Sequence, residues 1–267
     1  MKIAISGKGG VGKTTVAALL ARSLTLRGVQ VLAVDADPDA NLALALGAGD
    51  RQPTPLAQRR RLVEDRTGAR MGGQGGYFRL NPLVDDLPAE LAVDLDGIRL
   101  LVMGGVSSAG AGCVCPESAL VRALVTHLVL ASDEALVLDM EAGLEHLGRG
   151  TARGVDHLLV VVEPGRRAVA TALQVRALAA ELGIERVWLL ANKLLALDDL
   201  DYLTAALPGL PVLGHLLANP AIARADRDGQ PPWASAPDLL EAAGGWLDRL
   251  AGQEHTPLRS HPPGGRG

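Results

Sequence analysis

The chain has 267 residues, of which 48% are hydrophobic and 2% aromatic, and its formal net charge is −4. This length and composition are sufficient for one α/β domain whose core is built mainly from Leu, Ala and Val. The negative balance argues against nucleic acid as the main partner, and the basic run Arg59–Arg61 is more typical of a solvated loop face.

Short Val/Ile/Leu-rich runs alternate with longer helical patterns along the chain. The apolar runs predict strands at Lys2–Ser6, Val29–Val34, Ile98–Met103, Ala135–Asp139, His157–Val162, Val187–Ala191 and Pro211–Leu216. The helical patterns predict helices at Thr14–Arg27, Glu117–Leu130, Val169–Leu182 and Asp238–Leu250. This alternation is typical of a doubly wound, mostly parallel sheet with helices on both faces, which binds ligands at the carboxyl ends of its strands.

These elements predict a single domain at residues 1–251. Within it, residues 51–97 interrupt the alternation with Pro, Gly and charged residues, so we expect an excursion from the sheet that is partly helical and partly mobile. The Pro- and Gly-rich tail, 252–267, is predicted to be disordered. No apolar run is long enough to span a membrane, and the last helix has the acidic pattern of a docked surface helix rather than a membrane-binding one.

The first predicted strand leads into a glycine-rich loop, Gly7-Lys8-Gly9-Gly10-Val11-Gly12-Lys13-Thr14-Thr15. This is the G-x-x-x-x-G-K-[ST] pattern of phosphate-binding loops in its strand–loop–helix setting. The glycines let successive N–H groups turn toward phosphate oxygens, and the helix N-terminus adds the positive end of its dipole. We expect the loop to bind ATP or ADP, with Lys13 at the β- and γ-phosphates and the Thr14 hydroxyl on Mg²⁺.

A second lysine, Lys8, makes this loop unusual. In this respect the chain resembles the deviant Walker A ATPases, the class that includes MinD, ParA and the nitrogenase iron protein. The resemblance implies that Lys8 crosses a dimer interface to the phosphates of the partner, where it would act like an arginine finger. It also implies that Asp37 orients the attacking water, although Asp37 could simply cap a turn.

Two further strands end in acidic residues. The apolar strand Ala135–Asp139 ends in an aspartate, so Asp139 is the candidate residue for holding Mg²⁺, through water. The segment Met140–His146 would then lie where it can sense the γ-phosphate. Asp35 follows the second predicted strand and is either structural or a more distant partner of the ion.

Asn192 and Lys193 end another predicted strand, within Leu190–Leu195. Asn192 resembles the base-reading asparagine of phosphate-loop proteins. Guanine-specific members carry N-K-x-D, and Leu195 stands where that aspartate would be. Adenine is therefore the expected base.

The two cysteines of the chain, Cys113 and Cys115, are separated by one residue, and so small a number fits a reducing, cytoplasmic compartment. In an extended backbone, residues i and i+2 point the same way, so both thiols could face one metal ion. Two thiolates fall short of the four ligands of a closed site, and a two-fold axis through this segment would supply the other pair. The alternatives are two inert buried thiols or a local disulfide.

With this pair, the chain resembles the carbon monoxide dehydrogenase accessory ATPases of the CooC type over roughly residues 1–250. The resemblance rests on Gly7–Thr15, Glu64–Ala69, Leu80–Pro82, Cys113–Cys115, Asp139–Thr151, Glu163–Pro164 and Arg166–Arg167. It implies a nucleotide-dependent homodimer that binds Ni²⁺ or Zn²⁺ between its subunits at Cys113 and Cys115 and delivers nickel to carbon monoxide dehydrogenase.

Two other functions stay open. A partitioning or positioning ATPase like MinD or ParA would share the phosphate loop, but it leaves the cysteine pair unexplained. A reductase like the nitrogenase iron protein would carry an iron–sulfur cluster on the same four thiolates.

Overall fold

The computed structural model describes residues 1–69, 77–104, 116–131, 134–144, 147 and 149–254. Its centre is an eight-stranded sheet of order β3-β4-β2-β5-β1-β6-β7-β8. The strands are β1 Lys2–Ser6, β2 Val31–Asp35, β3 Val93–Leu95, β4 Ile98–Val102, β5 Ala135–Asp139, β6 His157–Val162, β7 Val187–Leu194 and β8 Val212–Leu217. All neighbours pair in parallel except β3 and β4 at one edge. The predicted doubly wound α/β fold is confirmed.

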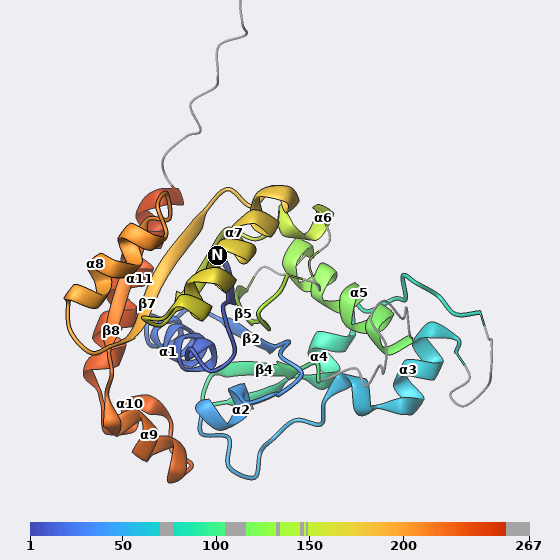
Figure 1. Ribbon diagram of the computed structural model, residues 1–267. Helices are drawn as coiled ribbons and strands as arrows, with labels where there is room; N and C mark the ends of the chain where they lie inside the picture. The colour runs from blue at the N-terminus through green and yellow to red at the C-terminus, as the bar shows by residue number, and fades with distance from the viewer. Residues whose placement is uncertain (70–76, 105–115, 132–133, 145–146, 148, 255–267) are drawn as a thin grey trace, which may run out of the picture.

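Helices cover the two faces of this sheet (Figure 1). On one face, α1 (Lys13–Leu26) packs against α11 (Asp238–Glu254). On the other, α5 (Pro116–Ala131), α6 (Arg149–Ala152) and α7 (Arg166–Leu182) contact one another in turn. Right-handed crossovers account for this division, because the chain moves along the sheet in one direction from β1 to β2 and in the other from β5 to β6 and β7.

The central strands β1, β2, β5 and β6 are almost wholly buried, which explains their continuous apolar sequences. Helix α11 closes one end of this core through buried residues that include Leu239, Trp246 and Leu250. An ion pair between Arg27 and Asp248, at 2.7 Å, links α11 to the end of α1. The last helix is therefore docked, as predicted. Within the described residues, no helix has the length and hydropathy needed to cross a membrane.

The shorter elements are where the structure departs from the sequence prediction. The predicted excursion 51–97 contains η1 (Leu56–Gln58), α3 (Arg60–Thr67) and α4 (Leu87–Leu91), but β3 also lies in this range and pairs with β4, so its last part returns to the sheet. A three-residue strand is too short to show an alternating pattern. Unpredicted helices also occur outside it, namely α2 (Leu42–Ala45), α6, α8 (Asp198–Ala206), α9 (Pro220–Arg227) and α10 (Pro232–Ser235).

The predicted disordered tail begins too early. Helix α11 continues through Glu254, so residues 252–254 are helical. Gly252 is only a weak stop signal, because a helix-interior glycine costs about 1 kcal/mol and α11 already contains Gly244 and Gly245. The remainder of the predicted tail, 255–267, lies outside the described residues.

Candidate functional site

The phosphate-binding loop lies at the carboxyl ends of the strands. Two of its glycines let its backbone pack closely against the neighbouring strands. Gly12, at φ +96, immediately precedes α1, and a Cβ on it would lie 2.3 Å from Asn192 Nδ2. Gly7, at φ +150, lies so close to β6 that a Cβ would be 2.3 Å from the Val161 carbonyl oxygen. Any side chain at these two positions would displace the loop from its neighbouring strands.

Hydrogen bonds from the end of β7 also hold the loop on this side of β1. Asn192 Nδ2 donates to the Val11 carbonyl oxygen at 2.7 Å, and the Lys193 amide donates to Asn192 Oδ1 at 2.9 Å. Lys193 is in the left-handed region, with φ 58, and its ammonium donates to the Gly10 carbonyl oxygen. Both residues therefore contact the loop, while nucleotide binding and base reading by Asn192 stay predictions.

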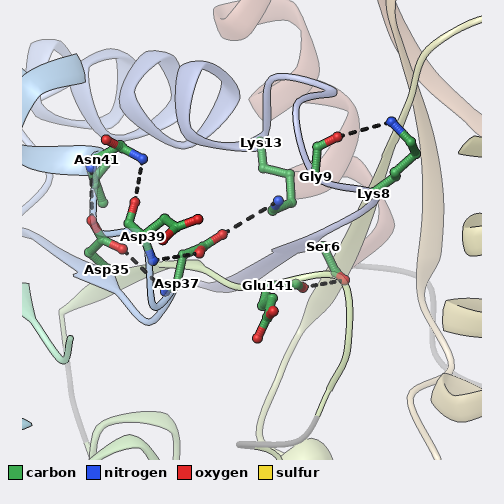
Figure 2. Close-up of polar contacts among 10 residues, drawn as sticks. Ser6, Lys8, Gly9, Lys13, Asp35, Asp37, Asp39, Asn41 and Glu141 are labelled. Atoms are coloured by element: carbon green, nitrogen blue, oxygen red, sulfur yellow. Dashed lines mark hydrogen bonds and ion pairs between the residues drawn. The ribbon is translucent and has the colours of Figure 1, made fainter. Parts of the chain in front are cut away.

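Two of the predicted catalytic residues meet beneath the loop. Lys13 is almost buried and its Nζ lies 3.6 Å from Asp37 Oδ2, as Figure 2 shows. The other oxygen, Asp37 Oδ1, accepts a hydrogen bond from the Asp39 amide at 3.0 Å. Lys13 therefore links the phosphate loop to the segment that follows β2. If Lys13 moves toward a bound phosphate, its ion pair with Asp37 breaks.

Two buried aspartates lie side by side on neighbouring strands, because the β2–β5 register pairs Asp35 with Asp139. Asp35 accepts hydrogen bonds from the amides of Leu42, at 2.8 Å, and Asp37, at 3.2 Å, which supports the structural role considered for it. Burial raises the pKa of Asp35 to about 6 and that of Asp139 to about 7. The Coulombic interaction with Asp35 also raises the pKa of Asp139, while the nearby Thr14 and Lys13 side chains lower it.

Asp139 is suited to a divalent cation. Neither of its carboxylate oxygens has a hydrogen-bond partner within the described part of the chain, although both are buried. A buried carboxylate without a partner is costly unless a positive charge compensates it. Mg²⁺ prefers oxygen ligands, and the Thr14 hydroxyl lies close to this carboxylate. The donor set of Thr14 and Asp139 therefore fits the ion.

A cavity of about 970 Å³ opens from the loop along the carboxyl edge of the sheet. Its phosphate end is formed by the loop itself with Asp37 and Asp39. Its far wall is formed by the end of β8, which was predicted as a strand, and by the start of α9, which was not predicted. This wall includes Leu217, Ala218, Asn219, Pro220, Ile222, Ala223 and Asp226. The pair Asn219-Pro220 is a helix-start signal, and Asn219 caps α9 by accepting from the Ala221 amide.

Lys8 lies away from the other predicted catalytic residues (Figure 2). Its Nζ is 3.4 Å from Glu163 Oε1 and 3.2 Å from the Gly9 carbonyl oxygen of the same chain. The predicted contact of Lys8 with a partner subunit involves a second chain and stays a prediction. Glu163 had entered the sequence analysis only as part of a family motif, without a role.

The predicted metal-binding cysteines, Cys113 and Cys115, lie outside the described residues. Among the residues that are described, no group of three or more His, Cys, Asp or Glu side chains could hold a metal ion. The segment predicted to sense the γ-phosphate, 140–146, is described only as far as Leu144. There the Ser6 hydroxyl donates to the Glu141 carbonyl oxygen at 3.0 Å, which ties the segment to the end of β1.

Comparison with known proteins agrees with this geometry. The family model of the CobQ/CobB/MinD/ParA nucleotide-binding domain matches residues 2–233. The chain is 47% identical over 232 residues to the carbon monoxide dehydrogenase accessory protein CooC of Rhodospirillum rubrum, covering 86% of this chain and 88% of that protein. It is 43% identical over 234 residues to an uncharacterized ATP-binding protein of Methanocaldococcus jannaschii, covering 86% and 90%.

Solved structures of the same fold include two MinD proteins. The MinD cell division protein of Aquifex aeolicus aligns with a TM-score of 0.66 and 20% identity over 96% of this chain and 99% of that one. The septum site-determining protein MinD of Pyrococcus horikoshii, solved with Mg-ADP, aligns with a TM-score of 0.66 and 22% identity over 94% and 97%. At these identities the likeness shows the fold alone.

The contact at Gly12 leads to a first prediction. Gly12→Ala should weaken ATP binding by about tenfold or more, equivalent to roughly 1.4 kcal/mol, because the new Cβ needs the space of the Asn192 amide. Titration with a fluorescent ATP analogue measures the affinity. Gly165→Ala is the matched control, since a Cβ there meets nothing within 4 Å. Equal affinities for the two variants would show that Gly12 is not needed for the shape of the loop.

The buried carboxylate of Asp139 leads to a second prediction. Its pKa is raised from 3.8 to about 7 in the folded chain, so the stability it contributes is complete below pH about 4 and is lost as pH rises through about 7. Asp139→Asn, which does not titrate, should therefore unfold at higher urea concentration than the wild type at pH 8 in EDTA. The difference should shrink toward pH 5.

Mg²⁺ should also reduce this difference at pH 8, because the ion compensates the Asp139 carboxylate and has less effect on the amide. Asp201→Asn, an exposed aspartate on α8, provides the control for a general charge effect. A stability difference between wild type and Asp139→Asn that stays constant from pH 5 to pH 8 would contradict the assignment of a buried, unpaired carboxylate.

Proposed function

The chain belongs to the CobQ/CobB/MinD/ParA family of nucleotide-binding domains, together with the CooC accessory protein, and from this premise we propose that it is a Mg²⁺-dependent ATPase that supplies a metal to carbon monoxide dehydrogenase. The observation that carries the proposal is the cavity at the carboxyl edge of the sheet, where Lys13, Asp37 and Thr14 line one space and Asp139 lies next to Thr14. That combination supplies the cation, the orienting carboxylate and the oxygen ligands that phosphoryl transfer needs.

The roles of the residues follow from their positions. The amides of the loop and the ammonium of Lys13 bind the phosphates, which draws Lys13 away from Asp37 Oδ2. Asp37 Oδ1 stays held by the Asp39 amide, so the released oxygen keeps its orientation and can accept a hydrogen bond from the attacking water. Thr14 and Asp139 would hold Mg²⁺, which when bound would supply positive charge at the phosphate oxygens.

The end of the cavity away from the phosphate loop, where the nucleotide base would bind, favours adenine over guanine. Leu195 occupies the position of the guanine-reading aspartate, lies at the rim of the cavity and is 86% exposed. It offers no acceptor for the ring N–H and amino groups of guanine. The far wall from Leu217 to Ala223 is mainly apolar and suits the face of a purine ring.

The metal cargo would bind at the predicted cysteine pair. Cys113 and Cys115 lie between β4 and α5 in the sequence, outside the described residues. Nucleotide-dependent dimerisation would bring two copies of the Cys-x-Cys pair together and form a four-thiolate site for Ni²⁺ or Zn²⁺. Hydrolysis and separation of the subunits would then release the ion to its client, carbon monoxide dehydrogenase, in line with the name of the CooC relative.

Asp37 provides the direct test of the hydrolytic mechanism. Asp37→Ala should retain ATP binding, since its removal leaves Lys13 free for phosphate, but should lose hydrolysis by about 10²-fold or more. Phosphate release under saturating ATP measures the turnover, and Asp201→Ala is the matched loss of an exposed aspartate. Turnover within about twofold of the wild type would exclude Asp37 as the orienting carboxylate.

The cysteines provide the test of the metal site. The protein should bind one Zn²⁺ or Ni²⁺ per dimer, and Cys113→Ser and Cys115→Ser should each abolish tight binding while ATP binding stays intact. Elemental analysis of dialysed protein, together with its mass in solution, gives the stoichiometry. One tightly held ion per monomer, or unchanged metal content in the double serine variant, would contradict the shared site. Iron with a visible absorption band would instead indicate the cluster-bearing alternative.

A further inference from the structure

Glu163 is the side-chain partner of Lys8. It follows β6 directly, and its Oε1 lies 3.4 Å from Lys8 Nζ, which also donates to the Gly9 carbonyl oxygen at 3.2 Å. Each side chain of the pair is about one-third exposed, at 33% for Lys8 and 30% for Glu163. The lysine is thus paired with a carboxylate of its own subunit. Figure 2 shows its ammonium beside Gly9 and apart from Lys13 and Asp37.

The sheet itself brings this pair together. Strands β1 and β6 are parallel neighbours, with Ser6 opposite Val160, so the residues that follow both strands emerge side by side. Gly7 then lies against the Val161 carbonyl oxygen, at a distance that no side chain could accommodate. The backbone at the base of Lys8 is therefore fixed beside the end of β6, and the ion pair follows from the packing of two central strands.

We propose that Glu163 is a positioning residue that retains Lys8 within its own subunit, so that Lys8 reaches the phosphates of a second copy only when the ion pair breaks. The inference rests on the proposed function, in which Lys8 acts across a homodimer. A triphosphate with several negative oxygens competes better for an ammonium group than one carboxylate does. Glu163 would therefore weaken dimerisation, and this effect would be smaller when the partner carries ATP.

The test is a double-mutant cycle on nucleotide-driven dimerisation. Glu163→Gln keeps the shape of the side chain and removes its charge, so it should tighten the dimer formed with a non-hydrolysable ATP analogue by about two- to fivefold, the range expected for a partly exposed ion pair. In a Lys8→Ala background, which should itself weaken the dimer, Glu163→Gln should have no effect. Sedimentation at several protein concentrations gives the dissociation constants of all four proteins.

Glu185→Gln is the matched control, because it changes the net charge equally. Glu185 is exposed and lies just before β7, at the amino ends of the strands and away from the phosphate loop. A weaker or unchanged dimer in Glu163→Gln would overturn the proposal, and so would an equal effect with and without Lys8. In those cases the cross-subunit role of Lys8 would stand if Lys8→Ala still weakens the dimer. A Lys8→Ala variant that dimerises normally would contradict that role, and the role of Glu163 with it.

Discussion

The phosphate-binding loop has its shape because the strands on one side of β1 leave it almost no room. At Gly7 the backbone lies against the Val161 carbonyl oxygen of β6, and at Gly12 it lies against the Asn192 amide at the end of β7. These contacts turn the loop so that α1 begins at Lys13, with its amino end and the Lys13 side chain directed at the same cavity. Hydrogen bonds from Asn192 and Lys193 to the loop carbonyls hold it from the same side. Phosphate binding, the position of Lys13 and the direction of Lys8 all depend on this packing.

On the opposite side of β1, the site carries an excess of negative charge. Asp35 and Asp139 are buried on adjacent strands, and Asp37 lies two residues after Asp35. Lys13 forms an ion pair with Asp37. Burial of the carboxylates raises the pKa of both Asp35 and Asp139, which marks the charged forms as costly in the folded chain. Asp35 is compensated by backbone amides, whereas Asp139 is suited to a bound cation. Folding stability is lost here in exchange for a site that favours Mg²⁺ with its nucleotide.

Much of this arrangement could be predicted from the sequence, because its signals are local. Lys13 and Thr14 lie in a nine-residue pattern, and Asp139 ends an apolar strand, so each was placed without knowledge of its neighbours. The contacts that join distant segments could not be predicted in the same way. Lys8 and Glu163 are 155 residues apart, and Asn192 and Val11 are 181 apart, so both contacts depend on the strand order β1-β6-β7. The wall from Leu217 to Asp226 was missed at α9, although the helix-start pair Asn219-Pro220 is a local signal for that helix.

In the proposed function, ATP hydrolysis at this edge of the sheet requires a second copy of the chain, with Lys8 completing the site of the partner. The most direct measurement is the rate of phosphate release per subunit as a function of protein concentration at saturating Mg-ATP. The rate per subunit should rise as the dimer forms and then level off, and Lys8→Ala should show a low rate without this rise. A rate per subunit that is already maximal at concentrations where sedimentation shows only monomers, and that does not rise as the dimer forms, would show that hydrolysis needs no second copy.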